Sequence, residues 1–253
     1  MTGRADLHVH TTYSDGVSSV PEVLEAAVDA GLDAIAITDH DTIEGALEAT
    51  VLGSAYRIET IVGAEITTRE GHLLGLFLKR LVPAGLTLAE SIAAVHEQGG
   101  VAVAAHPYDP ICFGVLNPWR HILTEEQVLE LPYDAMEVFN ACLPVSLPNR
   151  QAVRLAARAG TGRVAGSDAH SADTVGLGVT EFPGTTAEEL RAALHSRQTA
   201  PSGKYWTTRQ YLSLFRQREL RTVGVAAGYA AGLAGAVVGV AAMAVRSGVG
   251  RFV

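Results

Sequence analysis

Short apolar runs alternate with amphipathic stretches over roughly the first 200 residues of the chain. The apolar runs predict strands at Ala5–His10, Ala34–Thr38, Thr60–Thr67, His72–Leu78, Val101–His106, Ala135–Asn140, Arg163–Gly166 and Val179–Phe182. Helical spacing predicts helices at Val20–Ala30, Gly45–Ala55, Leu88–Glu97, Thr124–Leu131, Asn149–Ala159 and Thr186–His195. Strand–helix alternation of this kind predicts an α/β fold built on a mostly parallel sheet.

Metal-capable side chains fall at or just past the ends of the predicted strands. His8 and His10 are two residues apart on the first strand, so they point to one side while Leu7 and Val9 face the packing behind. Asp15 follows after a short turn and is suited to hold a second ion. Later strand ends carry Asp39, His40, Glu65, His106, Asp168 and His170. Because parallel barrels collect their functional groups at such ends, this placement favours a closed or nearly closed barrel over an open sheet.

A mixture of imidazoles and carboxylates suits Zn²⁺, Mn²⁺ or Fe²⁺ better than Ca²⁺. We therefore expect two or three such divalent ions, with Glu65 suited to bridge them. A single histidine near a strand end is commonly a hydrogen-bonded core residue. The recurrence of these residues at successive strand ends is what favours a metal centre.

Composition narrows the choice of function. The 253 residues carry a formal net charge of −8, so no broad basic surface for nucleic acid is expected, although a local basic groove is compatible with this balance. Cys112 and Cys142 are expected as reduced thiols of a cytoplasmic protein, with a single disulfide as the alternative. The N-terminus lacks a charged segment followed by an apolar run, so no signal peptide is expected.

Four motifs occur in order along the chain: Asp6–Gly16, Thr38–Asp41, Ala105–Pro107 and Gly166–His170. Through these motifs the chain resembles the PHP family, named for its polymerase and histidinol phosphatase members. The resemblance implies a distorted (β/α)7 barrel with up to three divalent ions at its mouth. It implies as metal ligands His8, His10, Asp15, His40, Glu65, His106, Asp168 and His170.

The resemblance leaves the third ion open. Asp15 stands where some members have histidine, which favours oxygen-preferring ions such as Mn²⁺. Glu137 or Asn140 stands near the place of a histidine that many trinuclear members carry. Together with His72, these two are candidates for a third metal or for contact with substrate.

The reaction that the resemblance implies is hydrolysis of a phosphate ester by a metal-bridged hydroxide. Asp168 or His170 is expected to carry a proton in this reaction. Asp39 and Asp41 are expected to orient His40 rather than to bind metal.

The resemblance is closest to small stand-alone members that act on nucleotides or short oligonucleotides. The expected substrate is therefore a nucleotide, a 3′,5′-bisphosphate nucleotide or short RNA or DNA. Such relatives often carry an arginine where this chain has Asp109, so Arg120 and Arg150 are candidates to hold the substrate phosphate. Histidinol phosphate or another small phosphate ester is the alternative substrate, and a non-catalytic PHP module is a further alternative.

Residues 108–123 form the longest irregular stretch and directly follow His106. Such a loop walls or covers a site, or is a packed connection. Both interpretations stay open from the sequence.

Three segments are expected: the phosphoesterase barrel at residues 1–200, a linker or amphipathic helix at 201–221, and a candidate transmembrane helix at 222–246. Thr222–Val245 carries no charged residue and, at ~1.5 Å per residue, is long enough to cross the ~30 Å apolar layer. Its glycines at four-residue spacing would suit a homo-oligomer through the tail. The catalytic domain is expected in the cytoplasm, anchored by this tail. The alternative is a soluble Gly/Ala-rich helix that packs on a partner.

Overall fold

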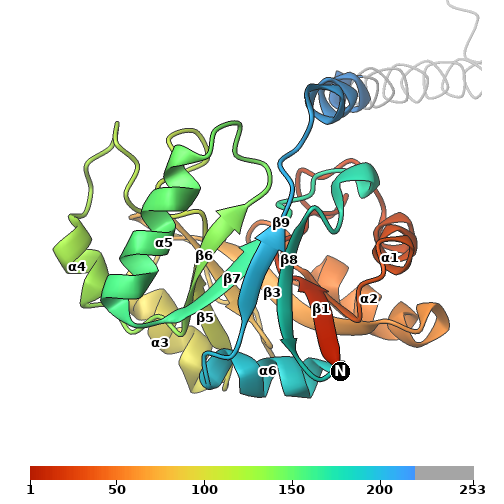
Figure 1. The fold of residues 1–253 in the computed structure, drawn as a ribbon, viewed down its shortest axis with the longest axis horizontal. Helices are drawn as coiled ribbons and strands as arrows, with labels where there is room; N and C mark the ends of the chain where they lie inside the picture. The colour runs from red at the N-terminus through yellow and green to blue at the C-terminus, as the bar shows by residue number, and fades with distance from the viewer. Residues whose placement is uncertain (220–253) are drawn as a thin grey trace, which may run out of the picture. The chain divides into compact units, whose positions relative to one another are not determined.

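The computed structural model describes residues 1–219, and the sheet with its helices lies within Met1–Gln210. Nine strands form one sheet in the order β7-β6-β5-β4-β3-β2-β1-β8-β9 (Figure 1). The strands are β1 (Thr2–Asp6), β2 (Ala34–Ile37), β3 (Glu59–Thr67), β4 (His72–Leu76), β5 (Val101–Ala104), β6 (Ala135–Asn140), β7 (Gly162–Gly166), β8 (Gly178–Pro183) and β9 (Ala200–Gly203). The α-helices are α1 (Val20–Asp29), α2 (Glu44–Tyr56), α3 (Leu88–Glu97), α4 (Glu125–Leu129), α5 (Leu147–Ala159) and α6 (Ala187–His195), with a 3₁₀ turn η1 at Ala172–Thr174. Residues 208–219 are also helical.

The nine-stranded sheet corrects the expected seven-stranded (β/α)7 arrangement. β1–β2–β3 and β5–β6–β7 pair in parallel, whereas β4 runs antiparallel between β3 and β5. The turn from Thr67 to His72 is too short for a crossover helix, so β4 returns as a hairpin. β8 and β9 are also antiparallel to their neighbours. β9 was not predicted because its sequence, Ala-Pro-Ser-Gly, is poor in strand-forming residues.

Side chains join β7, at one edge of the sheet, to β8 and β1 near the other edge, which confirms the nearly closed barrel. The Thr180 hydroxyl on β8 donates to the carbonyl of Ala165 and accepts from its N–H, both at 2.9 Å. The carboxylate of Asp6 at the end of β1 accepts the N–H of Ser167, just past β7, at 3.0 Å. Burial raises the pKa of Asp6 to about 6 despite this hydrogen bond.

Apolar residues pack in three clusters. One joins the strands to Phe182 and to Leu190 and Leu194 of α6, and Figure 1 shows α6 across the end of the sheet where the chain begins. A second cluster packs α3, α4 and α5 against β3 to β6, and a third packs α1 and α2 against β2. Leu7 belongs to the first cluster and Val9 to the third. Both residues are therefore buried in apolar packing, as expected, but in two different clusters. Polar residues lie instead at the C-terminal ends of the parallel strands, as at His40, His106 and Asp168.

Within residues 1–219, no helix is long and apolar enough to cross a membrane. The predicted transmembrane helix at 222–246 and its glycine-rich face lie outside the described residues. Cys112 and Cys142 form no disulfide within the described residues, which agrees with the predicted reduced thiols.

Candidate metal centre

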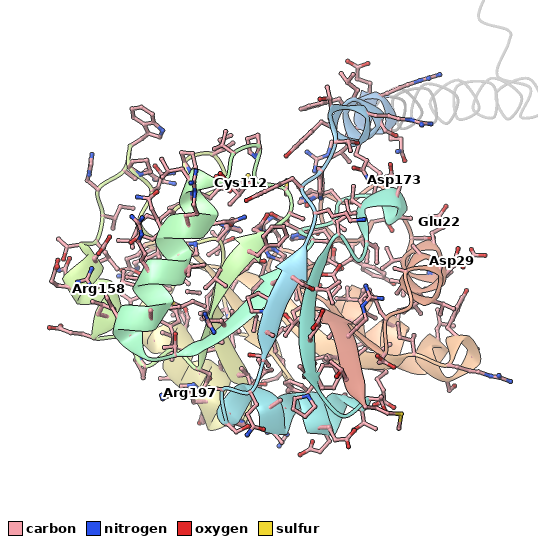
Figure 2. The ribbon with its side chains drawn as sticks, viewed as in Figure 1. Glu22, Asp29, Cys112, Arg158, Asp173 and Arg197 are labelled. Carbon is pink, nitrogen blue, oxygen red and sulfur yellow. The ribbon has the colours of Figure 1, made fainter. Side chains whose placement is uncertain are left out.

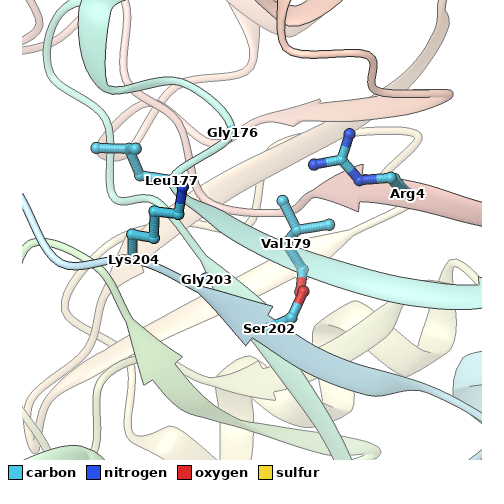
Figure 3. A pocket seen from close by; sticks show the side chains of 7 residues that line it. All are labelled: Arg4, Gly176, Leu177, Val179, Ser202, Gly203 and Lys204. Carbon is cyan, nitrogen blue, oxygen red and sulfur yellow. The ribbon is translucent and has the colours of Figure 1, made fainter.

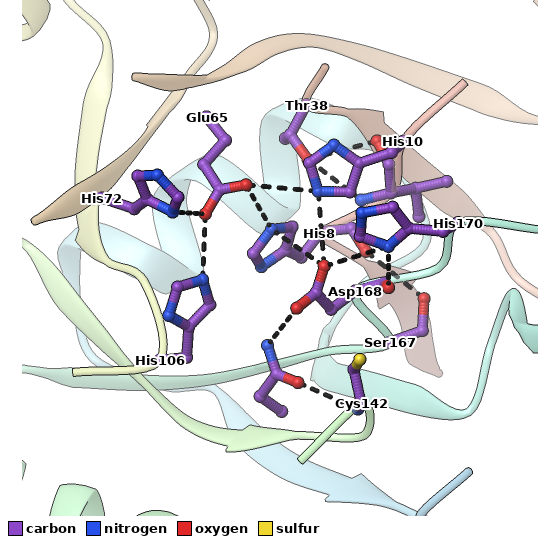
Figure 4. A network of polar contacts seen from close by, with 12 residues as sticks. His8, His10, Thr38, Glu65, His72, His106, Cys142, Ser167, Asp168 and His170 are labelled. Atoms are coloured by element: carbon purple, nitrogen blue, oxygen red, sulfur yellow. Dashed lines mark hydrogen bonds and ion pairs between the residues drawn. The ribbon is translucent and has the colours of Figure 1, made fainter. Parts of the chain in front are cut away.

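The strand ends bring the predicted donors to one mouth of the barrel (Figure 4). Because β4 runs antiparallel, its first residue lies at the same edge as the last residues of its parallel neighbours. The donors and their places are His8 and His10 after β1, His40 after β2, Glu65 in β3, His72 at the start of β4, His106 after β5, and Asp168 and His170 after β7.

Glu65 lies between two sets of imidazoles. Its Oε2 atom is 3.2 Å from His8 Nε2, 3.2 Å from His10 Nε2 and 3.3 Å from His40 Nδ1. Its Oε1 atom is 2.8 Å from His72 Nδ1 and 2.9 Å from His106 Nε2. Burial opposes the charge of this carboxylate, but the imidazoles outweigh burial and hold the pKa of Glu65 well below its usual value. Each oxygen of one carboxylate thus faces a different donor set.

Asp168 and Asp15 face the remaining nitrogens. Asp168 Oδ1 lies 3.6 Å from His8 Nε2, 3.3 Å from His10 Nε2 and 3.6 Å from His170 Nδ1. Asp15 Oδ2 lies 3.1 Å from His170 Nε2, and its Oδ1 lies 3.9 Å from His40 Nε2. Partial burial raises the pKa of Asp15, but the hydrogen bond to His170 and the neighbouring imidazoles bring it below its usual value.

The donor set fits divalent cations. His8 Nε2, both ring nitrogens of His10 and His106 Nδ1 are buried and make no well-formed hydrogen bond within the described chain. An unpartnered buried nitrogen is costly unless a ligand occupies it. Four overlapping groups of residues could each hold an ion, because within each group the ligand atoms lie within 4.8 Å of one another. The groups are His10/Asp15/His40/His170, His8/His10/Glu65, His8/His106/Asp168 and His40/Glu65/His72. Because these groups share members, they form one cluster.

Glu137 and Asn140 lie behind the cluster and contact its donors. Glu137 Oε1 is 3.1 Å from His8 Nδ1, and its Oε2 accepts the backbone N–H of His106 at 2.8 Å. The Asn140 amide donates to Glu137 at 3.2 Å and to Asp168 at 3.1 Å, and its oxygen accepts the N–H of Cys142. With Nδ1–H of His8 directed at Glu137, the Nε2 lone pair faces Glu65 and Asp168.

Unusual backbone conformations aim several of these side chains. Asp41, His106 and Asp168, each just past a strand end, have φ values of 52°, 24° and 52°. Such values are uncommon for residues with a side chain and concentrate at functional sites. A Cβ at Gly166 would lie 2.4 Å from both Glu137 Oε1 and the Cβ of His8, so only glycine fits between them.

Asp39 and Asp41 were expected to orient His40, but within the described residues both carboxylates bind other groups. Asp39 accepts the Thr11 N–H and hydroxyl at 2.7 Å each and the Ser14 hydroxyl at 2.6 Å, so it fixes the loop that carries Asp15. Asp41 accepts the N–H of Thr67 at 2.7 Å, at the end of β3. The physical reason is that backbone N–H groups near adjacent strand ends would lack an acceptor without these two carboxylates.

Comparison with known sequences decides the family. The PHP domain profile matches residues 6–138, and a PHP-associated profile matches residues 146–199. The chain belongs to the PHP domain family. Its cluster of imidazoles and carboxylates is of a kind that can hold divalent cations.

Relatives of this PHP domain differ in what their names state. An uncharacterised protein of Methanocaldococcus jannaschii, MJ1587, is 39% identical over 149 residues, which cover 54% of this chain and 82% of that protein. A 5′-3′ exoribonuclease of Haemophilus influenzae is 39% identical over 107 residues, covering 41% of this chain and 39% of the exoribonuclease. A phosphoribosyl 1,2-cyclic phosphate 1,2-diphosphodiesterase of Eggerthella lenta is 37% identical over 92 residues, covering 34% of this chain and 35% of that enzyme. The chain thus spans well under half the length of these two enzymes.

Solved structures share the fold. A two-domain protein from Bacteroides vulgatus with a PHP-like metal-dependent phosphoesterase superimposes with a TM-score of 0.69 at 19% identity, covering 86% of this chain and 70% of that one. Endonuclease Q in complex with a DNA duplex gives a TM-score of 0.58 at 19% identity, covering 78% of this chain and 57% of that one. At these identities the likeness concerns the fold alone.

The loop at 108–123 of the PHP domain is both a packed connection and a wall of the site. The N–H of Leu116 donates to Pro107 at 2.7 Å, and Val115 is buried. The carbonyl of Phe113 accepts the N–H of His72 at 3.1 Å, and the two rings meet edge-on at 5.4 Å. Sequence reasoning did not single out Phe113.

The two candidate arginines lie in different places. The guanidinium of Arg120 lies over the ring of Phe113 at 3.9 Å. Arg150, on α5, is exposed and donates to the hydroxyl of Ser146 at 3.0 Å. The structure therefore brings Arg120 to the wall of the site, whereas Arg150 contacts the residue that caps the start of its own helix.

Two further features were not foreseen. Trp206, after β9, donates its indole N–H to the carbonyl of Ser167 at 3.0 Å, and its ring meets that of His170 at 6.4 Å. No local sequence pattern pointed to it. A separate cavity of about 290 Å³ is lined by Arg4, Gly176, Leu177, Val179, Ser202, Gly203 and Lys204 (Figure 3), none of which is a predicted donor.

Proposed function

We propose that this protein hydrolyses a phosphate ester of a nucleotide, a 3′,5′-bisphosphate nucleotide or a short oligonucleotide. One observation carries the proposal: the two oxygens of Glu65 face separate sets of imidazoles, as a carboxylate shared between two cations does. The residues that would hold the cations are His8, His10, Asp15, His40, Glu65, His106, Asp168 and His170, with His72 as an additional donor. Mn²⁺, Fe²⁺ and Zn²⁺ suit this set of ligands.

Bound divalent cations would neutralise phosphate charge and lower the pKa of water, which supplies a nucleophile at neutral pH. The protein itself orients the groups around the reacting phosphorus. We assign proton transfer to Asp168 or His170, at an oxygen or ring nitrogen that would hold no cation; His170 Nδ1 lies 2.9 Å from the carbonyl of Asp168 and its Nε2 faces Asp15. The ring is thereby fixed as one tautomer with the second nitrogen toward the mouth.

The choice of substrate rests on the relatives. Two of them are named for cleavage of RNA and of a phosphoribosyl cyclic phosphate. These names favour an ester of a ribose phosphate over histidinol phosphate. The alternative of a non-catalytic module predicts that the protein binds no metal.

A panel assay on the full-length protein tests the proposal. Metal analysis should find Mn, Fe or Zn, and the protein should hydrolyse at least one of AMP, adenosine 3′,5′-bisphosphate, short RNA and short DNA. Glu65→Gln should abolish hydrolysis, whereas Asp29→Asn, at the exposed end of α1 (Figure 2), should leave it unchanged. Activity on histidinol phosphate alone would overturn the substrate assignment. Absence of bound metal would overturn the proposal that the protein is a metal-dependent enzyme.

A further inference from the structure

A cation is held against the wall of the metal centre. The guanidinium carbon of Arg120 lies 3.9 Å from the centroid of the Phe113 ring, and that ring meets His72 at 5.4 Å. His72 in turn contacts Glu65 at 2.8 Å. Three successive contacts, through Phe113 and His72, therefore connect Arg120 to the Glu65 carboxylate at the middle of the cluster.

The loop fixes the position of the Phe113 ring. Phe113 has a φ of 58°, a left-handed conformation that is unfavourable for a bulky residue. A Cβ at the next residue, Gly114, would lie 2.6 Å from the backbone nitrogen of Asp109, so only glycine fits there. The Asn117 side chain donates to the carbonyl of Asp109 at 3.1 Å and closes the same turn. The ring that supports Arg120 is thus set by the backbone.

The donors of Arg120 remain available for a ligand. Within residues 1–219, its guanidinium makes no hydrogen bond or ion pair, so it does not touch the carboxylates of the metal centre. Arg158, which Figure 2 labels, shows the contrast, because it forms ion pairs with Glu125 and Glu126. A guanidinium stacked by one face on an aromatic ring keeps its N–H edges free, and these edges match two phosphate oxygens.

We propose that Arg120, supported by Phe113, binds a second phosphate of the substrate, beside the phosphate that reacts at the metal centre. The inference rests on the function proposed above. Because Arg120 lies outside the carboxylate cluster, the phosphate that it binds is separate from the phosphate that reacts. The substrate class is therefore a nucleotide with two separated phosphates, or a short oligonucleotide, rather than a monophosphate. Arg120 is a specificity-determining residue in this assignment.

Two ligands that differ by one phosphate test the proposal: AMP and adenosine 3′,5′-bisphosphate. Dissociation constants are measured by calorimetry on the full-length protein with Ca²⁺ added to slow turnover, and kcat/KM is measured with Mn²⁺. Arg120→Met should weaken binding of the bisphosphate by about tenfold to a hundredfold, as for loss of a charged hydrogen-bond partner, and AMP by less than about twofold. Arg120→Lys should give an intermediate loss, since it keeps the charge but not the two-pronged geometry.

Arg158→Met is the matched control and should bind both ligands like the wild type. An equal loss for both ligands, no loss for either, or no binding of the bisphosphate by the wild type would overturn the assignment. Selective loss of bisphosphate binding without hydrolysis of any ester would keep this subsite and overturn the proposed function instead. Unchanged metal content and unfolding temperature in Arg120→Met would show that the effect is on the ligand.

Discussion

Replacing Glu137 by glutamine should weaken metal binding, although Glu137 is not one of the eight expected ligands and was only a candidate for a third metal or for substrate. Glu137 is buried, with 1% of its surface exposed, and serves two donors at once. Its Oε1 faces His8 Nδ1 at 3.1 Å and its Oε2 accepts the N–H of His106 at 2.8 Å. Glutamine keeps the shape but offers one oxygen and one NH₂ group, so it cannot accept from both.

The size of the effect follows from these contacts. If the new NH₂ group faces His8, the ring must accept at Nδ1 and carry its proton on Nε2, where it can no longer bind a cation. If it faces His106, a buried backbone N–H loses its acceptor. Loss of such support for a metal-binding histidine weakens metal affinity by about 10- to 100-fold, or about 1.4–2.7 kcal/mol.

The measurement is Mn²⁺ titration of the metal-stripped, full-length protein by calorimetry, with unfolding monitored by circular dichroism. Glu130→Gln, a change of the same chemistry at an exposed position after α4, is the control and should bind Mn²⁺ like the wild type. Wild-type affinity in a folded Glu137→Gln protein would refute the role assigned to this carboxylate.

Three further outcomes are expected. Burial opposes charge on His10 and His106, but carboxylates, Glu65 among them, outweigh it and raise their pKa values to about 10 and about 9, so both hold protons at neutral pH in the metal-free protein. Mn²⁺ must displace these protons, and its affinity should rise from pH 6 to pH 8, with proton release seen by calorimetry in two buffers; a flat profile would contradict this. Asp39→Ala should lower the free energy of unfolding in urea by about 2–3 kcal/mol, because the buried Thr11 N–H loses its acceptor, and stability equal to that of Asp29→Ala would count against it. Deleting residues 222–253 should release the protein from carbonate-washed membranes; recovery of the intact chain in the soluble fraction would show that the predicted anchor is wrong.

Local patterns predicted most strands and helices, and they failed where direction or pairing mattered. Apolar periodicity reports which residues are buried, but it carries no sign for strand direction, so β4 was placed without its antiparallel sense. The signal was present, since only residues 68–71 separate β3 from β4. β9 had no such signal, because Pro201 and Gly203 are unfavourable in a strand, and its pairing with β8 stabilises it instead.

The candidate site shows the same division between local and long-range information. The spacing of His8 and His10 and the repeated donors at strand ends are local, and the sequence was sufficient to name them. The support behind them is not local: Glu137 meets His8 only because Gly166, on the neighbouring strand, leaves no side chain between the two. Likewise, Phe113 reaches His72 through a left-handed turn that no periodicity reports. Candidate metal donors can therefore be predicted from their chemistry, whereas the residues that position them require the register of the fold.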